Sequence, residues 1–100
     1  MKFCFLDNTK FEYSYLDKYS PNLRGAETIL INLSENLKKL GHNVTVFNNC
    51  PCDINDNGLN WYNINNITKT DNFYFDVAIA NADMRLLNKV NAKKKNCNFI

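Results

Sequence analysis

The most constraining feature of this 100-residue sequence is an amphipathic run between residues 24 and 41. Apolar residues that recur every three or four positions share one side of an α-helix, and here they are Ala26, Ile29, Leu30, Leu33, Leu37 and Leu40. Gly41 can adopt the left-handed conformation that ends a helix, and it follows Lys38 and Lys39, where the helix dipole favours cations. The run therefore predicts a helix from Ala26 to Leu40.

Strand-like segments on both sides of this helix predict a parallel sheet. Lys2–Leu6 is an almost continuous apolar run, as in a strand covered on both faces, and Asn43–Phe47 is rich in β-branched residues. A strand, a helix and a second strand in this order form the crossover unit of parallel sheets.

Later segments extend the pattern to five strands. Leu59–Ile64 is predicted as the third strand, Phe75–Ala80 as the fourth, Ala82–Asn91 as a second helix, and Asn96–Ile100 as a truncated fifth strand. We expect an α/β fold: one partial, Rossmann-like domain over residues 1–100, a three-layer sandwich whose mostly parallel sheet has strand order 3-2-1-4-5. Its two helices should cover opposite faces.

This topology predicts a ligand crevice at the carboxyl ends of the first and fourth strands, where the strand order reverses. Gly25 and Asn81 should face each other across it, and amides at the helix start favour an anion. We expect the crevice, or a surface that binds a second substrate, to include Tyr13, Tyr15, Asn81 and Asp83. The alternative for the aromatic segment 8–23 is a short strand or a lid packed on the domain.

Composition and charge exclude several classes of protein. The chain is 45% hydrophobic and 22% charged, with a net charge of +2, which is typical of a globular protein and argues against nucleic acid as a partner. Lys93–Lys95 is predicted as the solvated end of a helix, with weak contact to a membrane surface as the alternative. With no signal peptide or long apolar run in the sequence, we expect a cytoplasmic protein with reduced cysteines and no metal site or cofactor.

Two common Rossmann chemistries do not fit the sequence. A dinucleotide dehydrogenase needs a glycine-rich loop directly after the first strand and an acidic residue after the second. Here the first strand is followed by Asp7-Asn8-Thr9-Lys10, and the second ends in Phe47-Asn48-Asn49. Methyltransferases of this topology require a similar glycine loop, and the phosphate-binding pattern G-x-x-x-x-G-K-[ST] is absent from the sequence as well.

Two stretches of the sequence resemble the amino-terminal domain of GT-B glycosyltransferases of the family 4 type. The first is Arg24-Gly25-Ala26-Glu27 with the helix that ends in Leu40-Gly41-His42-Asn43-Val44-Thr45-Val46, similar to the family's G-G-A-E and L-x-x-x-G-H-x-V-T-V. The second is Phe75–Asn81, which is similar to the family's next central strand. The resemblance implies that the loop Arg24, Gly25 and Ala26 approaches the diphosphate of a nucleotide-sugar donor bound mainly by another domain.

The sequence departs from that family at two points. Arg24 replaces the first glycine, so its guanidinium either pairs with phosphate in place of a backbone contact or blocks close approach. A donor-binding domain has no counterpart in residues 1–100, and His42 matches the structural turn after the helix instead of a catalytic position. We therefore predict part of a glycosyltransferase, inactive alone, that acts on an unknown acceptor.

The alternative function is a non-catalytic Rossmann-like module that binds a ligand or a partner protein. An exposed last strand would offer its edge to a partner chain or to a second copy. The two hypotheses differ in one testable property, which is whether the helix start near Gly25 binds a nucleoside diphosphate.

Overall fold

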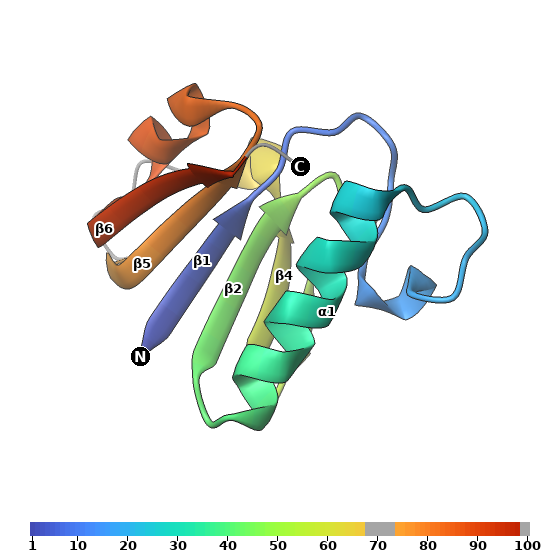
Figure 1. Ribbon diagram of the computed structural model, residues 1–100, viewed down its shortest axis with the longest axis horizontal. Helices are drawn as coiled ribbons and strands as arrows, with labels where there is room; N and C mark the ends of the chain where they lie inside the picture. The colour runs from blue at the N-terminus through green and yellow to red at the C-terminus, as the bar shows by residue number, and fades with distance from the viewer. Residues whose placement is uncertain (68–73, 99–100) are drawn as a thin grey trace.

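The computed structural model describes residues 1–67 and 74–98, which form one mixed six-stranded sheet with a single α-helix (Figure 1). The strands are β1 (Lys2–Leu6), β2 (Asn43–Asn48), β3 (Ile54–Asp56), β4 (Leu59–Asn63), β5 (Tyr74–Asn81) and β6 (Asn91–Asn98). The helices are α1 (Gly25–Lys39) and three 3₁₀ helices, η1 (Tyr15–Asp17), η2 (Ile64–Asn66) and η3 (Met84–Lys89). The fold is therefore of the α/β type.

The strand order is β3-β4-β2-β1-β5-β6, with every neighbouring pair parallel except β3 and β4. This order differs from the expected 3-2-1-4-5, because β3 adds a sixth, antiparallel strand beside β4. The segment of β3 contains only one apolar residue, Ile54, and its sequence predicts a polar loop. The turn between β3 and β4 matches its sequence: Asn57 and Gly58 have φ values of 44° and 97°, as tight hairpin turns require.

Helix α1 confirms the predicted helix and its end. Gly41 has a φ of +93°, and the amides of Gly41 and His42 donate to the carbonyls of Lys38 and Leu37 at 2.9 and 3.1 Å. These bonds satisfy carbonyls that the last turn of a helix leaves free. The helix thus turns back directly into β2.

The prediction of one apolar stripe on α1 is wrong in detail. The helix buries Glu27, Leu30, Ile31 and Ser34 against the sheet, while Ile29, Leu33 and Leu40 stay exposed. The apolar positions span too wide an arc for one contact face, so the sheet covers one side of that arc only. The exposed residues form a second stripe.

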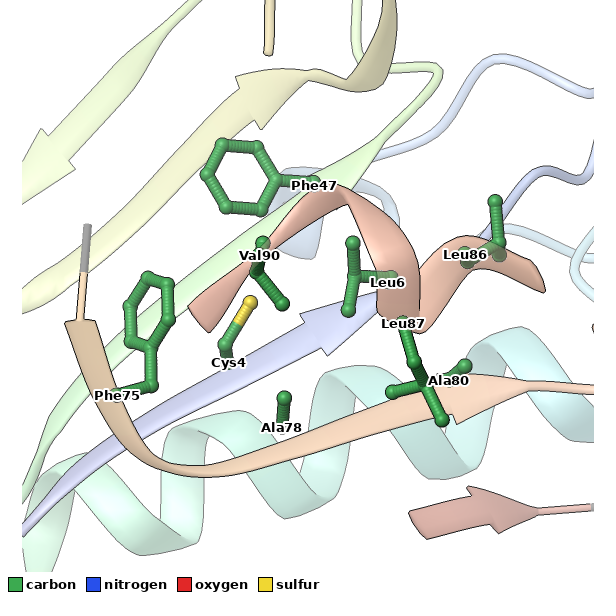
Figure 2. Close-up of a cluster of buried hydrophobic side chains, with 9 residues drawn as sticks. All are labelled: Cys4, Leu6, Phe47, Phe75, Ala78, Ala80, Leu86, Leu87 and Val90. Carbon is green, nitrogen blue, oxygen red and sulfur yellow. The ribbon is translucent and has the colours of Figure 1, made fainter. Parts of the chain in front are cut away.

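Two apolar clusters lie on opposite faces of the sheet. Helix α1 packs over β2 and β4 (Figure 1), where Leu30 and Ile31 contact a cluster that includes Phe5, Val46 and Trp61. The other face carries Leu86 and Leu87 of η3, with Val90, over alternate residues of β1 and β5 (Figure 2). Segments on both sides of the central strands therefore exclude water from them.

The second helix and the last strand differ from their predictions. The expected α-helix over Ala82–Asn91 is the shorter 3₁₀ helix η3, so the described residues have an α-helix on only one face of the sheet. The expected strand Asn96–Ile100 begins earlier, at Asn91, and its residues 99–100 lie outside the described part. Lys93, Lys94 and Lys95 consequently lie in β6 rather than at a helix end, because pairing with β5 fixes them in an extended backbone.

Candidate functional site

Polar residues gather where the parallel strands β1, β2 and β5 end. Asp7 follows β1, Asn48 closes β2 and Asn81 closes β5. These strands are neighbours in register, since Leu6 pairs with both Phe47 and Ala80. Their carboxyl ends therefore meet at one edge of the sheet, called here the carboxyl edge.

Asp7 is the centre of a hydrogen-bond network at this edge. Its carboxylate is 1% exposed and accepts bonds from the Thr9 amide at 3.1 Å, the Thr9 hydroxyl at 2.8 Å, the Asn81 side-chain amide at 3.4 Å and the Tyr13 hydroxyl. Burial, and then the charge of Asp7, raise the pKa of Tyr13 far above its ordinary value. Tyr13 therefore remains a protonated donor near neutral pH, and Asp7 fastens the following loop to the sheet.

Asn48 holds the same loop from β2. Its side chain is buried, and its amide nitrogen donates to the backbone carbonyl of Tyr13 at 2.7 Å. The backbone amide of Tyr13 donates in turn to the carbonyl of Asn49 at 3.3 Å. The path of the chain after β1 is thus fixed by side chains and backbone of both central strands.

The turn after β5 is strained and is joined to β1. Ala82 has a φ of +64°, which is costly for a residue with a Cβ, and the Asp83 amide donates to the Asn81 carbonyl across it at 2.8 Å. The Asp83 carboxylate accepts from Asn8 at 3.1 Å and from Arg85 at 3.0 Å. Those bonds, mainly the ones from Arg85, hold the pKa of Asp83 below its usual range.

We expect Ala82→Gly to raise the free energy of unfolding by about 0.5 to 1 kcal/mol, because relief of left-handed strain exceeds the added chain entropy. Urea unfolding followed by the fluorescence of Trp61 measures this change. The control is Ala92→Gly in β6, where no positive φ exists and the substitution should destabilise. Equal destabilisation by both variants would show that the turn at Ala82 is not strained.

The start of α1 is open to solvent. Gly25 is exposed, and a Cβ built on it meets no atom within 4 Å. Arg24 precedes it as the N-cap without a side-chain cap bond, and its Nε donates to Oε1 of Glu27 at 3.1 Å. Because Glu27 is 2% exposed while Arg24 is 71% exposed, the arginine offsets a buried charge and extends into solvent.

The predicted site residues fall into three separate places. Ala26 and Asn81 line one depression of ≈ 50 Å³ together with Phe5, Ile29 and Ile79, so the helix start does lie beside the end of β5. Ligand pockets commonly measure about 300 to 1,000 Å³, so this depression alone is too small for a sugar. Asp83 lies nearby at the carboxyl edge, bonded to Asn8.

The two tyrosines predicted for the site, Tyr13 and Tyr15, lie away from Ala26, Asn81 and Asp83. Tyr13 is fully buried beside Trp61. It therefore supports the site from within, and its side chain is not accessible to an acceptor substrate. Tyr15 lines a different groove, of ≈ 390 Å³, between η1, the second half of α1 and β3, and its hydroxyl donates to Asp56 at 3.3 Å. Lys18, Lys38 and Glu35 line the same groove.

Sequence reasoning missed Asp7 and Asn48 as organisers of the carboxyl edge. The available signal was position, because a polar residue directly after a buried central strand must find partners at the sheet edge. Cys4, Cys50, Cys52 and Cys97 are all free thiols. Within residues 1–67 and 74–98, no three histidine, cysteine, aspartate or glutamate side chains gather closely enough to hold a metal ion.

The described helices also lack the combination of length and apolarity that crossing a bilayer requires. Comparison with known proteins gives no matching family model, no matching curated protein and no matching solved structure. The relation to glycosyltransferases therefore stays a prediction from the residues of the helix start and the strands beside it.

Proposed function

We propose that this chain is the amino-terminal domain of a family 4 type GT-B glycosyltransferase, whose helix start at Gly25 contacts the diphosphate of a nucleotide-sugar donor. In this proposal the sheet is a variant of the Rossmann-like three-layer sandwich, with β4, β2, β1, β5 and β6 in the places of strands 3-2-1-4-5 and η3 in place of a second α-helix. The observation that supports it most is the open helix start beside Asn81 at the carboxyl edge.

The chemistry at this helix start suits a phosphate group. Thr28 is the first residue of α1 whose amide donates to a carbonyl four residues earlier, that of Arg24, at 3.1 Å. The amides of Gly25, Ala26 and Glu27 come before this first intrahelical hydrogen bond and have no acceptor within the helix. Such amides and the positive end of the helix dipole favour an anion. In a complete enzyme they would stabilise the leaving diphosphate while the reactants are held in position.

Arg24 takes a double role in this proposal. Its Nε pairs with the buried Glu27, which would otherwise repel a phosphate, and its exposed side chain leaves the terminal guanidinium nitrogens within reach of the ligand. A site built on one helix end, without the donor domain, should bind weakly. We therefore expect no glycosyl transfer by residues 1–100 alone, and turnover of a nucleotide sugar by them would contradict the proposal.

Titration with uridine diphosphate, followed by amide chemical shifts, tests the site. We expect shifts at residues 25–27 and a dissociation constant on the order of 1 mM, or about 4 kcal/mol of binding. Gly25→Asp should abolish these shifts by repulsion, yet stabilise the fold by about 0.3 to 1 kcal/mol, because the carboxylate favours the helix start. Loss of binding and gain of stability in one variant cannot come from unfolding.

Two matched variants complete the test. Gly25→Ala should keep binding, because the space around Gly25 is open, and Asn32→Asp repeats the change in net charge at an exposed position farther along α1. If wild-type protein gives no shift at residues 25–27, or if Asn32→Asp weakens binding as much as Gly25→Asp, the phosphate site is wrong.

The second candidate is a non-catalytic Rossmann-like interaction module. The exposed apolar stripe on α1 favours it, since isolated surface side chains are common but an ordered stripe is not. The edge of β6, predicted as a pairing surface, carries Lys93, Lys94 and Lys95. Lysines on an edge strand oppose pairing with another chain, so α1 is the better candidate for a protein contact.

A further inference from the structure

The groove of ≈ 390 Å³ between η1, the second half of α1 and the hairpin of β3 and β4 has no part in the proposed function. Its volume lies within the range of about 300 to 1,000 Å³ that ligand pockets commonly have. Figure 1 shows η1 beside α1, on the side away from β5. At 1.5 Å per residue, Lys38 in the groove is roughly 20 Å along the helix from Gly25. The groove is therefore separate from the carboxyl edge.

Part of the groove lining is apolar and held in place. Tyr15, Leu16 and Leu59 line it, and Leu59 is buried in the core beneath. The Tyr15 ring lies 6.2 Å from the Trp61 ring, and its hydroxyl donates to Asp56 at 3.3 Å. Because these contacts already fix the ring, a ligand that packs on Tyr15 does not have to order it first.

The charged side chains of the groove are paired with one another. Nζ of Lys18 lies 3.1 Å from Oε2 of Glu35, and Nζ of Lys38 lies 3.2 Å from Oδ2 of Asp56. Lys39 lines the same groove and has no ionic partner among the described residues. The lysines and the carboxylates therefore nearly balance, and the groove has no strong field of either sign.

One carboxylate in the groove lacks a hydrogen-bond donor. Oε1 of Glu35 is shielded from water and receives no bond from the residues that the structure describes. An unpaired oxygen of this kind is costly, so it calls for an explanation such as an absent ligand. The last torsion of a glutamate side chain turns easily, which lets a donor in the groove reach the carboxylate while Lys18 keeps its bond.

These features favour a neutral ligand that is rich in hydroxyl groups. A charged ligand would compete with Lys18 or Lys38 for a carboxylate, or with a carboxylate for a lysine, and would break an ion pair. A hydroxyl group can donate to a carboxylate and accept from an ammonium group with both ion pairs intact. Such bonds to charged groups are stronger than bonds between neutral ones.

We propose that this groove binds a neutral saccharide, whose hydroxyl groups bond to Glu35, Lys38 and Lys39 while a C–H face of its ring packs on Tyr15. The apolar lining and the paired charges then each meet a matching part of one ligand. The proposal uses no residue of the helix start at Gly25, so it is independent of the proposed glycosyltransferase function.

Titration of the full chain with glucose and with maltose, up to about 100 mM and followed by amide chemical shifts, tests the groove. We expect shifts at residues 15–19 and 35–39, with a dissociation constant on the order of 10 mM, and none at residues 25–27. Glucosamine and glucuronate add a charge to the same ring and should bind at least threefold more weakly. Because uridine diphosphate is expected to shift residues 25–27 instead, either site can fail without the other.

Glu35→Gln should weaken glucose binding at least fivefold, because an amide oxygen is a poorer acceptor than a carboxylate and Lys18 loses its ion pair. The fold should tolerate the change, since it removes a charge that is poorly solvated, and a dispersed amide spectrum checks this. Glu12→Gln is the matched control, an exposed glutamate outside the groove with the same change in net charge. The proposal is overturned if neither sugar shifts the groove residues, if a charged analogue binds as tightly as glucose, or if both variants weaken binding equally.

Discussion

Asp7→Ala should lower the free energy of unfolding by about 3 to 5 kcal/mol, because the buried donors around the carboxylate lose their acceptor. Four bonds converge on Asp7, from the backbone and hydroxyl of Thr9, from Tyr13 and from Asn81. An unpaired buried donor costs about 1 to 3 kcal/mol, and water cannot easily reach a position that is 1% exposed. The loop after β1 and the end of β5 should loosen together.

Urea unfolding of Asp7→Ala, followed by Trp61 fluorescence, measures the loss. Tyr13→Phe removes one of the four donors and should cost less, about 1 to 2 kcal/mol. Asp53→Ala is the matched control, since Asp53 is an exposed aspartate outside this network, and it should change stability little. A loss below about 1 kcal/mol for Asp7→Ala would mean that the network does not hold the carboxyl edge.

The parts of the fold that the sequence predicts well are those with local causes. The helix over residues 26–40 has an apolar period and a terminating glycine, and β1, β2 and β5 are largely apolar or β-branched runs. Strand β4 combines asparagines with Leu59 and Trp61 and begins directly after a turn signal. The tight turn at Asn57 and Gly58 follows from two residues that tolerate positive φ. Periodicity and turn chemistry are enough for such elements.

The parts that the sequence mispredicts depend on tertiary pairing. Residues 91–95 have the composition of a solvated helix end, yet register with β5, including Val77 opposite Lys94, makes them a strand. Ile54 cannot signal a strand alone, and β3 exists because its backbone pairs with β4. The apolar arc of α1 could not reveal which side the sheet would cover, because that depends on the tilt of the helix over β2 and β4.

In the candidate site, too, some features follow from sequence patterns and others depend on tertiary contacts. The proximity of the helix start to Asn81 follows from the crossover topology, which the strand pattern predicts. The burial of Tyr13 does not, because it depends on a carboxylate acceptor from β1 and an aromatic partner from β4. Alternating aromatic residues in a loop are equally compatible with an exposed binding surface and with burial against the sheet. Only those two partners decide between the alternatives.

Trp61→Ala should cost about 3 to 5 kcal/mol, as expected when a fully buried tryptophan leaves a cavity that its neighbours cannot fill. Trp61 lies on β4 opposite Val46 of β2, in the cluster under α1. Its ring meets Tyr13 edge-on at 6.0 Å and Tyr15 at 6.2 Å, so it joins the segment after β1 to the sheet. A domain of this size has about 5 to 15 kcal/mol of stability in total, so the variant should be close to unfolding.

Thermal unfolding followed by far-ultraviolet circular dichroism measures this loss, because the substitution removes the only tryptophan from the chain. Trp61→Phe should cost less than half as much, since it keeps an aromatic ring, and the indole nitrogen that it removes has no hydrogen-bond partner among the described residues. Tyr19→Ala removes an exposed ring of η1's flanking loop and should have little effect. If Trp61→Ala and Tyr19→Ala cost the same, the aromatic segment does not pack on β4. Tyr13 would then be able to reach the surface, and the prediction that it contacts the acceptor substrate would stand again.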